Sequence, residues 1–240
     1  MSRDEFYRTP EAETPPFEFS EAVVKVFPDM IERSVPGYSL LLELTPIIVQ
    51  RAVQPDSRIY DLGCSLGAAT LAARRAVQVE GVEMLAVDSS SSMVERCREV
   101  LAADNSRVPV EVIEANILDL SIENASIVML YFTLQFIDPA KRDGLLKCIY
   151  QGLKPGGVLM LAEKLAFDTD KQAWLDTHHH DFKRGQGYSD LEIARKRQAL
   201  ENVLVPETRS AHHQRLQQAG FIGAIDWFQC LNFAAMIATK

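Results

Sequence analysis

The chain has 240 residues, of which 47% are hydrophobic and 24% charged, and its formal net charge at pH 7 is −8. This length suits one α/β domain with a sizeable core. An acidic protein is a poor direct partner for nucleic acid, because binding a polyanion needs basic surface to replace its counterions. No apolar run reaches membrane-spanning length, and residues 1–16 are polar, unlike a signal peptide. We therefore expect a soluble, cytoplasmic protein that binds neither membrane nor nucleic acid directly.

The cysteines and histidines do not form a recurrent metal-binding pattern. The four cysteines are far apart in the chain and include no CxxC pair: Cys64, Cys97, Cys148 and Cys230. Reduced thiols are the simplest interpretation. The run His178-His179-His180-Asp181 cannot direct three adjacent rings at one ion from a helix face, and no other ligand stands at a zinc spacing. We expect no metal site.

The sequence of the N-terminal part predicts an irregular segment followed by helices. Residues 1–19 are polar and proline-rich, which predicts a loosely ordered segment. Apolar residues then recur at helical spacing, with Pro28 expected to break that helix or to start a second one. We expect residues 20–56 to form a helical lid across the ligand edge of the domain. Its turn at Val35-Pro36-Gly37-Tyr38 would present an aromatic ring to a cation, although an ordinary half-buried tyrosine is an equal alternative.

The stretch from Ile59 to Thr70 carries the strongest signal. An apolar strand ends in Asp61, Gly63 and Gly67 follow, and small residues open a helix. Such a turn lets a ligand approach the backbone at the carboxyl edge of a sheet. The next strand ends in Asp88, where an acid can accept hydrogen bonds from both ribose hydroxyls. The glycines bracket three residues, unlike GxGxxG, which favours an adenosyl-methionine pocket over a dinucleotide pocket.

Strands alternate with helices through most of the chain, which predicts a doubly wound parallel sheet. Further strands are expected at residues 108–114, 125–132, 158–162, 221–228 and 230–238, and the last two should pair antiparallel. Ser92-Met93-Val94-Glu95 is a predicted capping box, and Asp138-Pro139 should start a helix. Residues 167–220 form a predicted helical insertion, whose capping box Ser189-Asp190-Leu191-Glu192 precedes the basic trio Arg195, Lys196 and Arg197.

Two levels of family resemblance follow from these residues. Asp61-Leu62-Gly63-Cys64-Ser65-Leu66-Gly67, the acid Asp88 and Leu153-Lys154-Pro155-Gly156-Gly157 resemble class I S-adenosylmethionine (SAM)-dependent methyltransferases. More specific motifs resemble the carboxy-S-adenosyl-L-methionine synthases, and they are spread from about Phe19 to the C-terminus. They are Val26-Phe27-Pro28-Asp29-Met30-Ile31, Arg33-Ser34-Val35-Pro36-Gly37-Tyr38, Phe132-Thr133-Leu134-Gln135-Phe136, Ile149-Tyr150-Gln151-Gly152-Leu153, His179-His180-Asp181-Phe182-Lys183-Arg184, Gly187-Tyr188-Ser189 and Trp227-Phe228-Gln229-Cys230.

The resemblance implies a Rossmann-like fold, with a mostly parallel seven-stranded sheet and an antiparallel C-terminal edge. Residues 20–240 would form a single SAM-binding domain, with the insertion at a homodimer interface. It also implies an enzyme that carboxylates the methyl group of SAM using prephenate and releases phenylpyruvate. SAM is then a substrate, and no metal is needed. The product would serve a separate enzyme that modifies the wobble uridine of tRNA, so this acidic chain need not hold RNA.

By position, the resemblance implies a nucleoside and methionine pocket lined by Tyr38, Gly63, Cys64, Ser65, Asp88, Ser89, Asn116, Ile117 and Tyr131. Arg197 would be the catalytic residue that faces the new carboxylate, from the neighbouring subunit, because its planar fork suits a carboxylate. Arg195 and Lys196 are interpreted as a solvated helix face. Asn116 stands where the family commonly has an acid, and Tyr131 where it commonly has an asparagine.

Three hypotheses remain open on the sequence alone. In a carboxy-transfer enzyme, a sulfonium would acidify its methyl group, and the resulting ylide would attack carbon dioxide released from prephenate in a closed site. A conventional small-molecule methyltransferase has the support of the fold, but residues 131–134 offer neither an Asn-Pro-Pro-Tyr motif nor an evident base. A non-catalytic protein that stores or senses SAM would bind the ligand without turnover.

Overall fold

A mixed sheet forms the centre of the computed structural model, which describes residues 2–8 and 14–240. Its seven strands lie in the order β3-β2-β1-β4-β5-β8-β7, and a short β6 pairs with β5 off this path. In chain order the strands are β1 (Arg58–Leu62), β2 (Glu83–Asp88), β3 (Val110–Glu114), β4 (Ala125–Tyr131), β5 (Leu153–Ala166), β6 (Glu207–Thr208), β7 (Ile222–Cys230) and β8 (Phe233–Thr239). Only β8 runs antiparallel to its neighbours β5 and β7. The predicted mostly parallel sheet with an antiparallel C-terminal edge is confirmed.

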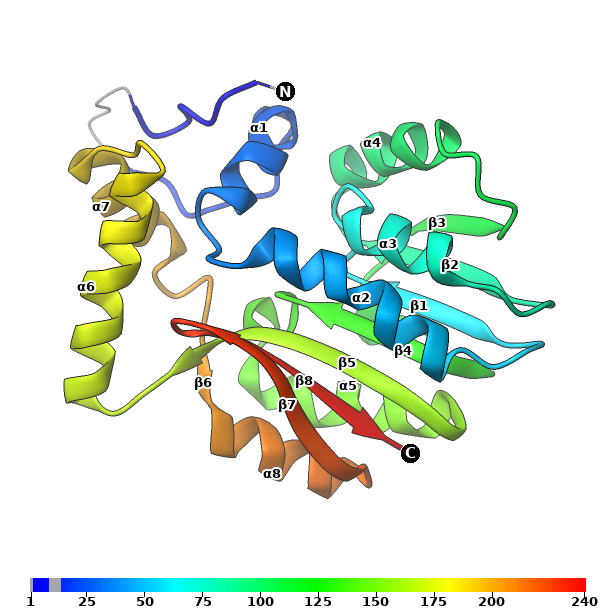
Figure 1. Cartoon of the computed structure of the whole chain (residues 1–240). Helices are drawn as coiled ribbons and strands as arrows, with labels where there is room; N and C mark the ends of the chain where they lie inside the picture. The colour runs from blue at the N-terminus through cyan, green and yellow to red at the C-terminus, as the bar shows by residue number, and fades with distance from the viewer. Residues whose placement is uncertain (1, 9–13) are drawn as a thin grey trace.

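Helices cover both faces of the sheet and one of its ends (Figure 1). One face carries α2 (Tyr38–Ala52), α3 (Ala68–Ala76) and α4 (Ser91–Ala102), and the other carries α5 (Pro139–Gly152) and α8 (Arg209–Ala219). Beyond the carboxyl ends of the parallel strands stand α1 (Glu21–Glu32), α6 (Thr169–Gly185) and α7 (Asp190–Leu200). Two short 3-10 turns, η1 (Ile117–Asp119) and η2 (Leu134–Phe136), follow β3 and β4. The carboxyl edge is therefore walled by helices.

The central strand β4 explains why the sheet is a rigid platform. All seven of its residues are buried. Val128 and Leu130 belong to the core that contains Leu146 of α5, whereas Ile127 and Met129 belong to the core that contains Leu41 of α2. A strand buried on both faces needs an apolar run, and β4 is apolar except at Ser126.

Several local predictions are tested by the backbone. Pro28 lies inside α1, so the predicted break is wrong. Proline lacks a backbone N–H, so α1 loses one hydrogen bond at Pro28. Burial of Val23 and Met30 stabilises the helix by more than that loss costs. The predicted capping box at Ser92 is also wrong, because the N-cap is Ser90, whose hydroxyl accepts from Met93 N at 3.3 Å. The box at Ser189 is confirmed.

The described part of the N-terminal segment, which we expected to be loosely ordered, makes specific contacts with the rest of the domain. The backbone N–H of Asp4 donates to Asp29 Oδ2 at 2.6 Å, and the hydroxyl of Tyr188 donates to the Asp4 carboxylate. Tyr7 and Phe17 are buried against α1, α4 and α7. Two aromatic anchors and a buried carboxylate thus hold a segment whose overall composition is polar. Residues 9–13, which include one of its prolines, lie outside the described residues.

The predicted helical insertion divides into two parts. Helices α6 and α7 depart from the sheet and stand next to α1, whereas α8 returns to pack beside α5 (Figure 1). Leu216 of α8 belongs to the same core as Leu145 of α5. The excursion therefore ends near residue 206, and α8 belongs to the sheet-covering layer.

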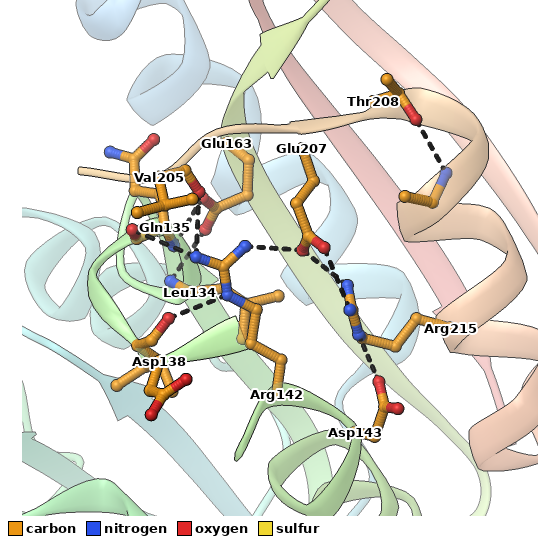
Figure 2. A network of polar contacts seen from close by, with 12 residues as sticks. Leu134, Gln135, Asp138, Arg142, Asp143, Glu163, Val205, Glu207, Thr208 and Arg215 are labelled. Atoms are coloured by element: carbon orange, nitrogen blue, oxygen red, sulfur yellow. Dashed lines mark hydrogen bonds and ion pairs between the residues drawn. The ribbon is translucent and has the colours of Figure 1, made fainter. Parts of the chain in front are cut away.

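A buried glutamate fastens the loop that follows β4 to the end of β5. Glu163 is fully buried, and its two carboxylate oxygens each accept one backbone N–H, from Leu134 and from Gln135, both at 2.9 Å (Figure 2). The amide oxygen of Gln135 in turn accepts from Lys164 N at 3.1 Å. These contacts fix the loop after β4, because the N–H groups of Leu134 and Gln135 are buried and need an acceptor.

Arg142 fastens the same loop from the other side. Its fully buried guanidinium donates to the carbonyls of Ile137 and Val205, both at 2.9 Å, and pairs with Glu207 at 2.6 Å. Arg215 also pairs with Glu207, at 2.6 Å (Figure 2). We name the Glu163, Arg142 and Glu207 contacts the strand-end clamp. It ties the loop after β4 to the segment that returns from α7.

The strand-end clamp predicts a pH dependence of stability. Burial raises the pKa of Glu163 to about 8, while the N–H groups of Leu134 and Gln135 and the charge of Arg142 oppose the shift. A raised pKa means that the folded state holds this proton more tightly than the unfolded state. The contribution of Glu163 to stability is therefore full below the unfolded pKa and is lost as the pH rises to about 8.

We expect the free energy of unfolding of the wild type to fall by a few kcal/mol more than that of Glu163→Gln between pH 5 and pH 8, since one pKa unit is worth about 1.4 kcal/mol. Urea denaturation at the two pH values measures this difference. Equal pH slopes for the two proteins would show that Glu163 titrates normally.

Candidate active site

Two adjoining cavities open at the carboxyl edge of the sheet. The larger has a volume of about 1060 Å³ and is walled by the ends of β1 to β5 and by α1, α6 and α7. The smaller, of about 450 Å³, lies between α1, α2 and the turn after β1. Both are lined by the shared residues Phe27, Ile31, Gly63, Ser65, Tyr131 and Phe132. They form one continuous site around the glycine turn.

The glycine turn after β1 requires the residues that it has. Gly63 has φ of +81°, and a Cβ there would lie 2.3 Å from Thr133 Oγ1. Ser65 also adopts a positive φ, of 48°. Its backbone N–H donates to Asp88 Oδ2 at 2.9 Å, and Asp88 Oδ1 accepts from Ser90 N at 2.9 Å. Burial raises the pKa of Asp88, while these N–H groups oppose that rise. The acid at the end of β2 thus faces the turn, as its spacing in the sequence suggested.

Asp61, predicted only as part of the glycine-turn motif, lies at the cavity wall. It is 2% exposed, lines the smaller cavity and accepts a hydrogen bond from the Thr70 hydroxyl at 2.5 Å. Burial raises its pKa to about 6, against the Thr70 hydrogen bond. Asp29 and Glu32 line the same cavity, and among the residues that the structure describes no lysine or arginine does. This acidic lining suits a cationic ligand group.

All the residues implied by the resemblance border these cavities. The larger is lined by Gly63, Ser65, Asp88, Ser89, Asn116, Ile117, Tyr131 and Arg197, and Tyr38 and Cys64 line the smaller. The two departures from the family pattern are held by the protein itself. Asn116 Oδ1 accepts from Leu118 N at 3.0 Å, and the Tyr131 hydroxyl lies 3.0 Å from Thr45 Oγ1. Tyr131 is therefore anchored toward α2.

Phe132 is a strained residue that sequence reasoning missed as a site residue. Its φ is +56°, which is rare for a bulky side chain. Its backbone N–H donates to the carbonyl of Ala162 at 2.6 Å, and its ring lies 6.3 Å from that of Tyr38. The neighbouring strand-end clamp holds this conformation. Such local strain is typical of functional sites.

The wall formed by α6, α7 and the end of β5 is basic. Lys164, Lys183, Lys196 and Arg197 line the larger cavity. Lys196 is 6% exposed and Arg195 is 8% exposed, so the interpretation of these two as a solvated helix face is wrong. Lys196 Nζ donates to Ser34 Oγ at 2.8 Å, because the described N-terminal segment and the loop after α1 cover this side of α7.

Arg197 differs from its neighbours in being exposed while it lines the cavity of its own chain. Within the described part of the chain, its guanidinium has no hydrogen-bond or ion-pair partner. A free guanidinium at a cavity wall is available to a carboxylate.

Two histidines of α6 make contacts within the protein. His179 Nε2 lies 2.7 Å from the carbonyl of Ser34, and burial lowers its pKa to about 3. His178 stacks on Trp174 with ring centroids 3.7 Å apart. Within residues 2–8 and 14–240, no group of three potential ligands is placed to hold a metal ion. The four cysteines all belong to the described residues and are free thiols.

Comparison with known proteins identifies the family. A carboxy-S-adenosyl-L-methionine synthase of Yersinia enterocolitica is 53% identical over 239 residues, which are 99% of this chain and 90% of that protein. The synthase of Yersinia pestis strain Pestoides F matches to the same extent. The chain belongs to the carboxy-S-adenosyl-L-methionine synthase family. The resemblance to the synthases noted in the sequence is thus confirmed.

Beyond the synthases, the chain is similar to methyltransferases. The family model described as a methyltransferase domain matches residues 59–157. Human N-acetylserotonin methyltransferase, solved in complex with SAM, is 18% identical with a TM-score of 0.62 and aligns over 92% of this chain and 56% of its own. An O-methyltransferase family protein of Burkholderia thailandensis is 15% identical with a TM-score of 0.66, over 92% and 59%. This chain therefore covers less than two thirds of each of these two solved chains. At such low identity, the similarity of the structures shows a shared fold only.

No helix within the described ranges combines the length and the apolar character that a bilayer crossing needs.

The glycine turn predicts a large stability cost for a single methyl group. Gly63→Ala should destabilise the protein by about 1–3 kcal/mol, because it adds a clash with Thr133 to a strained φ. Thermal and urea unfolding measure this cost.

Gly144→Ala is the matched control. Gly144 lies within α5, and a Cβ there would meet nothing within 4 Å. It should stabilise the protein by up to about 1 kcal/mol. A Gly63→Ala protein as stable as the wild type would contradict the steric account of the turn.

Proposed function

We propose that the protein converts SAM and prephenate into carboxy-SAM and phenylpyruvate. The observation that carries this proposal is the free guanidinium of Arg197 in the cavity that also contains the glycine turn. A methyl transfer leaves no new carboxylate and has no need of such a cation. The family membership of the chain supports the same reaction. We further propose a cytoplasmic enzyme whose product serves a separate tRNA wobble-uridine modifying enzyme.

SAM would span the two cavities. The ribose would bind at Asp88 and the adenine beside Asn116 and Ile117, where β2 and β3 end. The methionine arm would enter the smaller cavity, whose acids include Asp61. An ammonium group fits that acidic lining, and the ring of Tyr38 there is suited to the sulfonium. The methyl group would then face the larger cavity.

The reaction would be completed by groups on the two substrates. The sulfonium acidifies the methyl C–H bonds, and loss of a proton gives an ylide. Prephenate loses carbon dioxide and hydroxide as its ring becomes aromatic, and the hydroxide can accept the methyl proton to give water. The new C–C bond forms between the ylide carbon and carbon dioxide. Helices α1, α6 and α7 would keep bulk water from these species.

Arg197 would act on the charge that this step creates. The carbon dioxide oxygens become a carboxylate, and the planar guanidinium can bind both of them. We propose that the functional form is a homodimer joined through α6 and α7, with Arg197 reaching the partner's site or its own. The exposed Trp174 on α6 and Leu191 on α7 support an interface there.

A turnover assay tests the proposed function. Purified protein incubated with SAM and prephenate should form phenylpyruvate and a SAM derivative heavier by one carbon dioxide. Formation of S-adenosylhomocysteine with a methyl acceptor would favour a conventional methyltransferase. SAM binding without turnover of either kind would favour a storage or sensing protein.

Substitution of Arg197 should weaken binding of the product carboxy-SAM much more than binding of the substrate SAM. Arg197→Ala is expected to weaken the affinity for carboxy-SAM by about tenfold or more, because one charge-assisted pair is lost. The affinity for SAM should change by less than about twofold. Calorimetric titration with each ligand measures both values.

Arg96→Ala is the control, because Arg96 lies exposed on α4 and pairs with Glu99. It should leave both affinities unchanged. Equal weakening of the two ligands by Arg197→Ala would remove Arg197 from the carboxylate site.

A further inference from the structure

The basic wall of the larger cavity contains two ammonium groups that form no ion pair with the residues that the structure describes. Lys183, on α6, is only 7% exposed, and Lys164, near the end of β5, is half-buried. Both line the cavity. Among residues 2–8 and 14–240, neither Nζ has a hydrogen-bond or ion-pair partner. An unpaired buried cation is costly to maintain, so its presence at a cavity points to an anionic ligand.

The other charged groups around this wall make contacts of their own. Lys196 donates to Ser34 at 2.8 Å, and Arg184 pairs with Asp181 at 2.6 Å and with Asp190 at 2.7 Å. Asp176 lines the cavity and favours the charged form of both lysines, but its Oδ1 accepts from Gln172 at 2.9 Å.

The remaining neighbours do not neutralise the two lysines. Burial lowers the pKa of both His179 and His180, so these rings are neutral at pH 7 and above. The exposed Glu201 also lines the cavity. Burial, together with Lys196 and Lys164, lowers the pKa of Lys183 to about 7. A bound anion would reverse that shift and keep the ammonium charged.

The position of the lysines separates them from the SAM arm. The smaller cavity has the acids Asp29, Glu32 and Asp61, whereas Lys164 and Lys183 line only the larger one. Helices α6 and α7 stand apart from the strands that carry the glycine turn (Figure 1). The charge distribution therefore provides two different binding regions, one for a cation and one for an anion.

We infer that Lys183 and Lys164 form a carboxylate subsite for the second substrate. This inference rests on the proposed function, in which that substrate is the dicarboxylate prephenate. The lysines bind the side-chain carboxylate that phenylpyruvate retains. An ammonium paired with the departing carboxylate would stabilise the ground state and oppose loss of carbon dioxide. A cation on the retained carboxylate orients the substrate without that penalty.

The experiment compares variants in the SAM-saturated protein. Lys183→Met and Lys164→Met should each raise the KM for prephenate and the inhibition constant of phenylpyruvate by about tenfold or more, as expected for loss of a charge-assisted contact. The Kd for SAM, from calorimetry, should stay within about twofold. Lys171→Met is the matched control, because Lys171 lies exposed on α6 and pairs with Asp168. It should change none of the three constants.

The possible outcomes separate the alternatives. Unchanged prephenate and phenylpyruvate constants in both variants would overturn the subsite. Weaker SAM binding would assign the lysines to the methionine carboxylate instead. A raised KM for prephenate with unchanged phenylpyruvate inhibition would assign them to the departing carboxylate, against our inference. A wild type that neither binds nor consumes prephenate would overturn the proposed function and the subsite together.

Discussion

The carboxylate of Glu163 is the contact on which the geometry of the site depends. Its two oxygens bind the N–H groups of Leu134 and Gln135, directly after the strand that forms the centre of the sheet. Phe132, strained at a positive φ, and Thr133, packed against Gly63, belong to the same loop. Because Arg142 binds that loop from the other side, the cavity floor is fixed by fully buried polar side chains. A loop held only by solvent-exposed contacts would not keep these side chains against the glycine turn.

The cations that we assign to the second substrate and to the product lie beyond the part that matches the methyltransferase model. The methyltransferase model ends at residue 157, whereas Lys164, Lys183 and Arg197 all follow it. These cations belong to the end of β5 and to the excursion formed by α6 and α7. The shared part would bind the nucleoside, and the excursion would provide the surroundings for an anionic second substrate. In this proposal, one added wall would give a methyltransferase-like fold a different reaction.

The sequence predicted the parts of the structure that local chemistry controls. The apolar run of β4, the glycine turn with Asp88, and the cap at Ser189 were all predicted correctly. The helix break predicted at Pro28 was wrong, because tertiary packing outweighs the loss of one backbone hydrogen bond.

The missed features depend on contacts between distant segments. Asp4 meets Tyr188 across most of the chain, and Arg142 meets Glu207 on a strand that only the fold brings near. Lys183 lay within a recognised motif, but its burial could not be read from the sequence, because a basic residue on a helix is usually solvated. The role that we infer for Lys183 therefore depends on its position in the cavity wall.

The most direct test of the central claim is the mass of the small molecule that the purified protein carries. Protein purified from cells that contain prephenate is denatured, and the released ligand is analysed by mass spectrometry. The proposed reaction predicts a species heavier than SAM by one carbon dioxide. Release of only SAM or S-adenosylhomocysteine, from protein that also fails to consume prephenate, would contradict the assignment of carboxy transfer to this site.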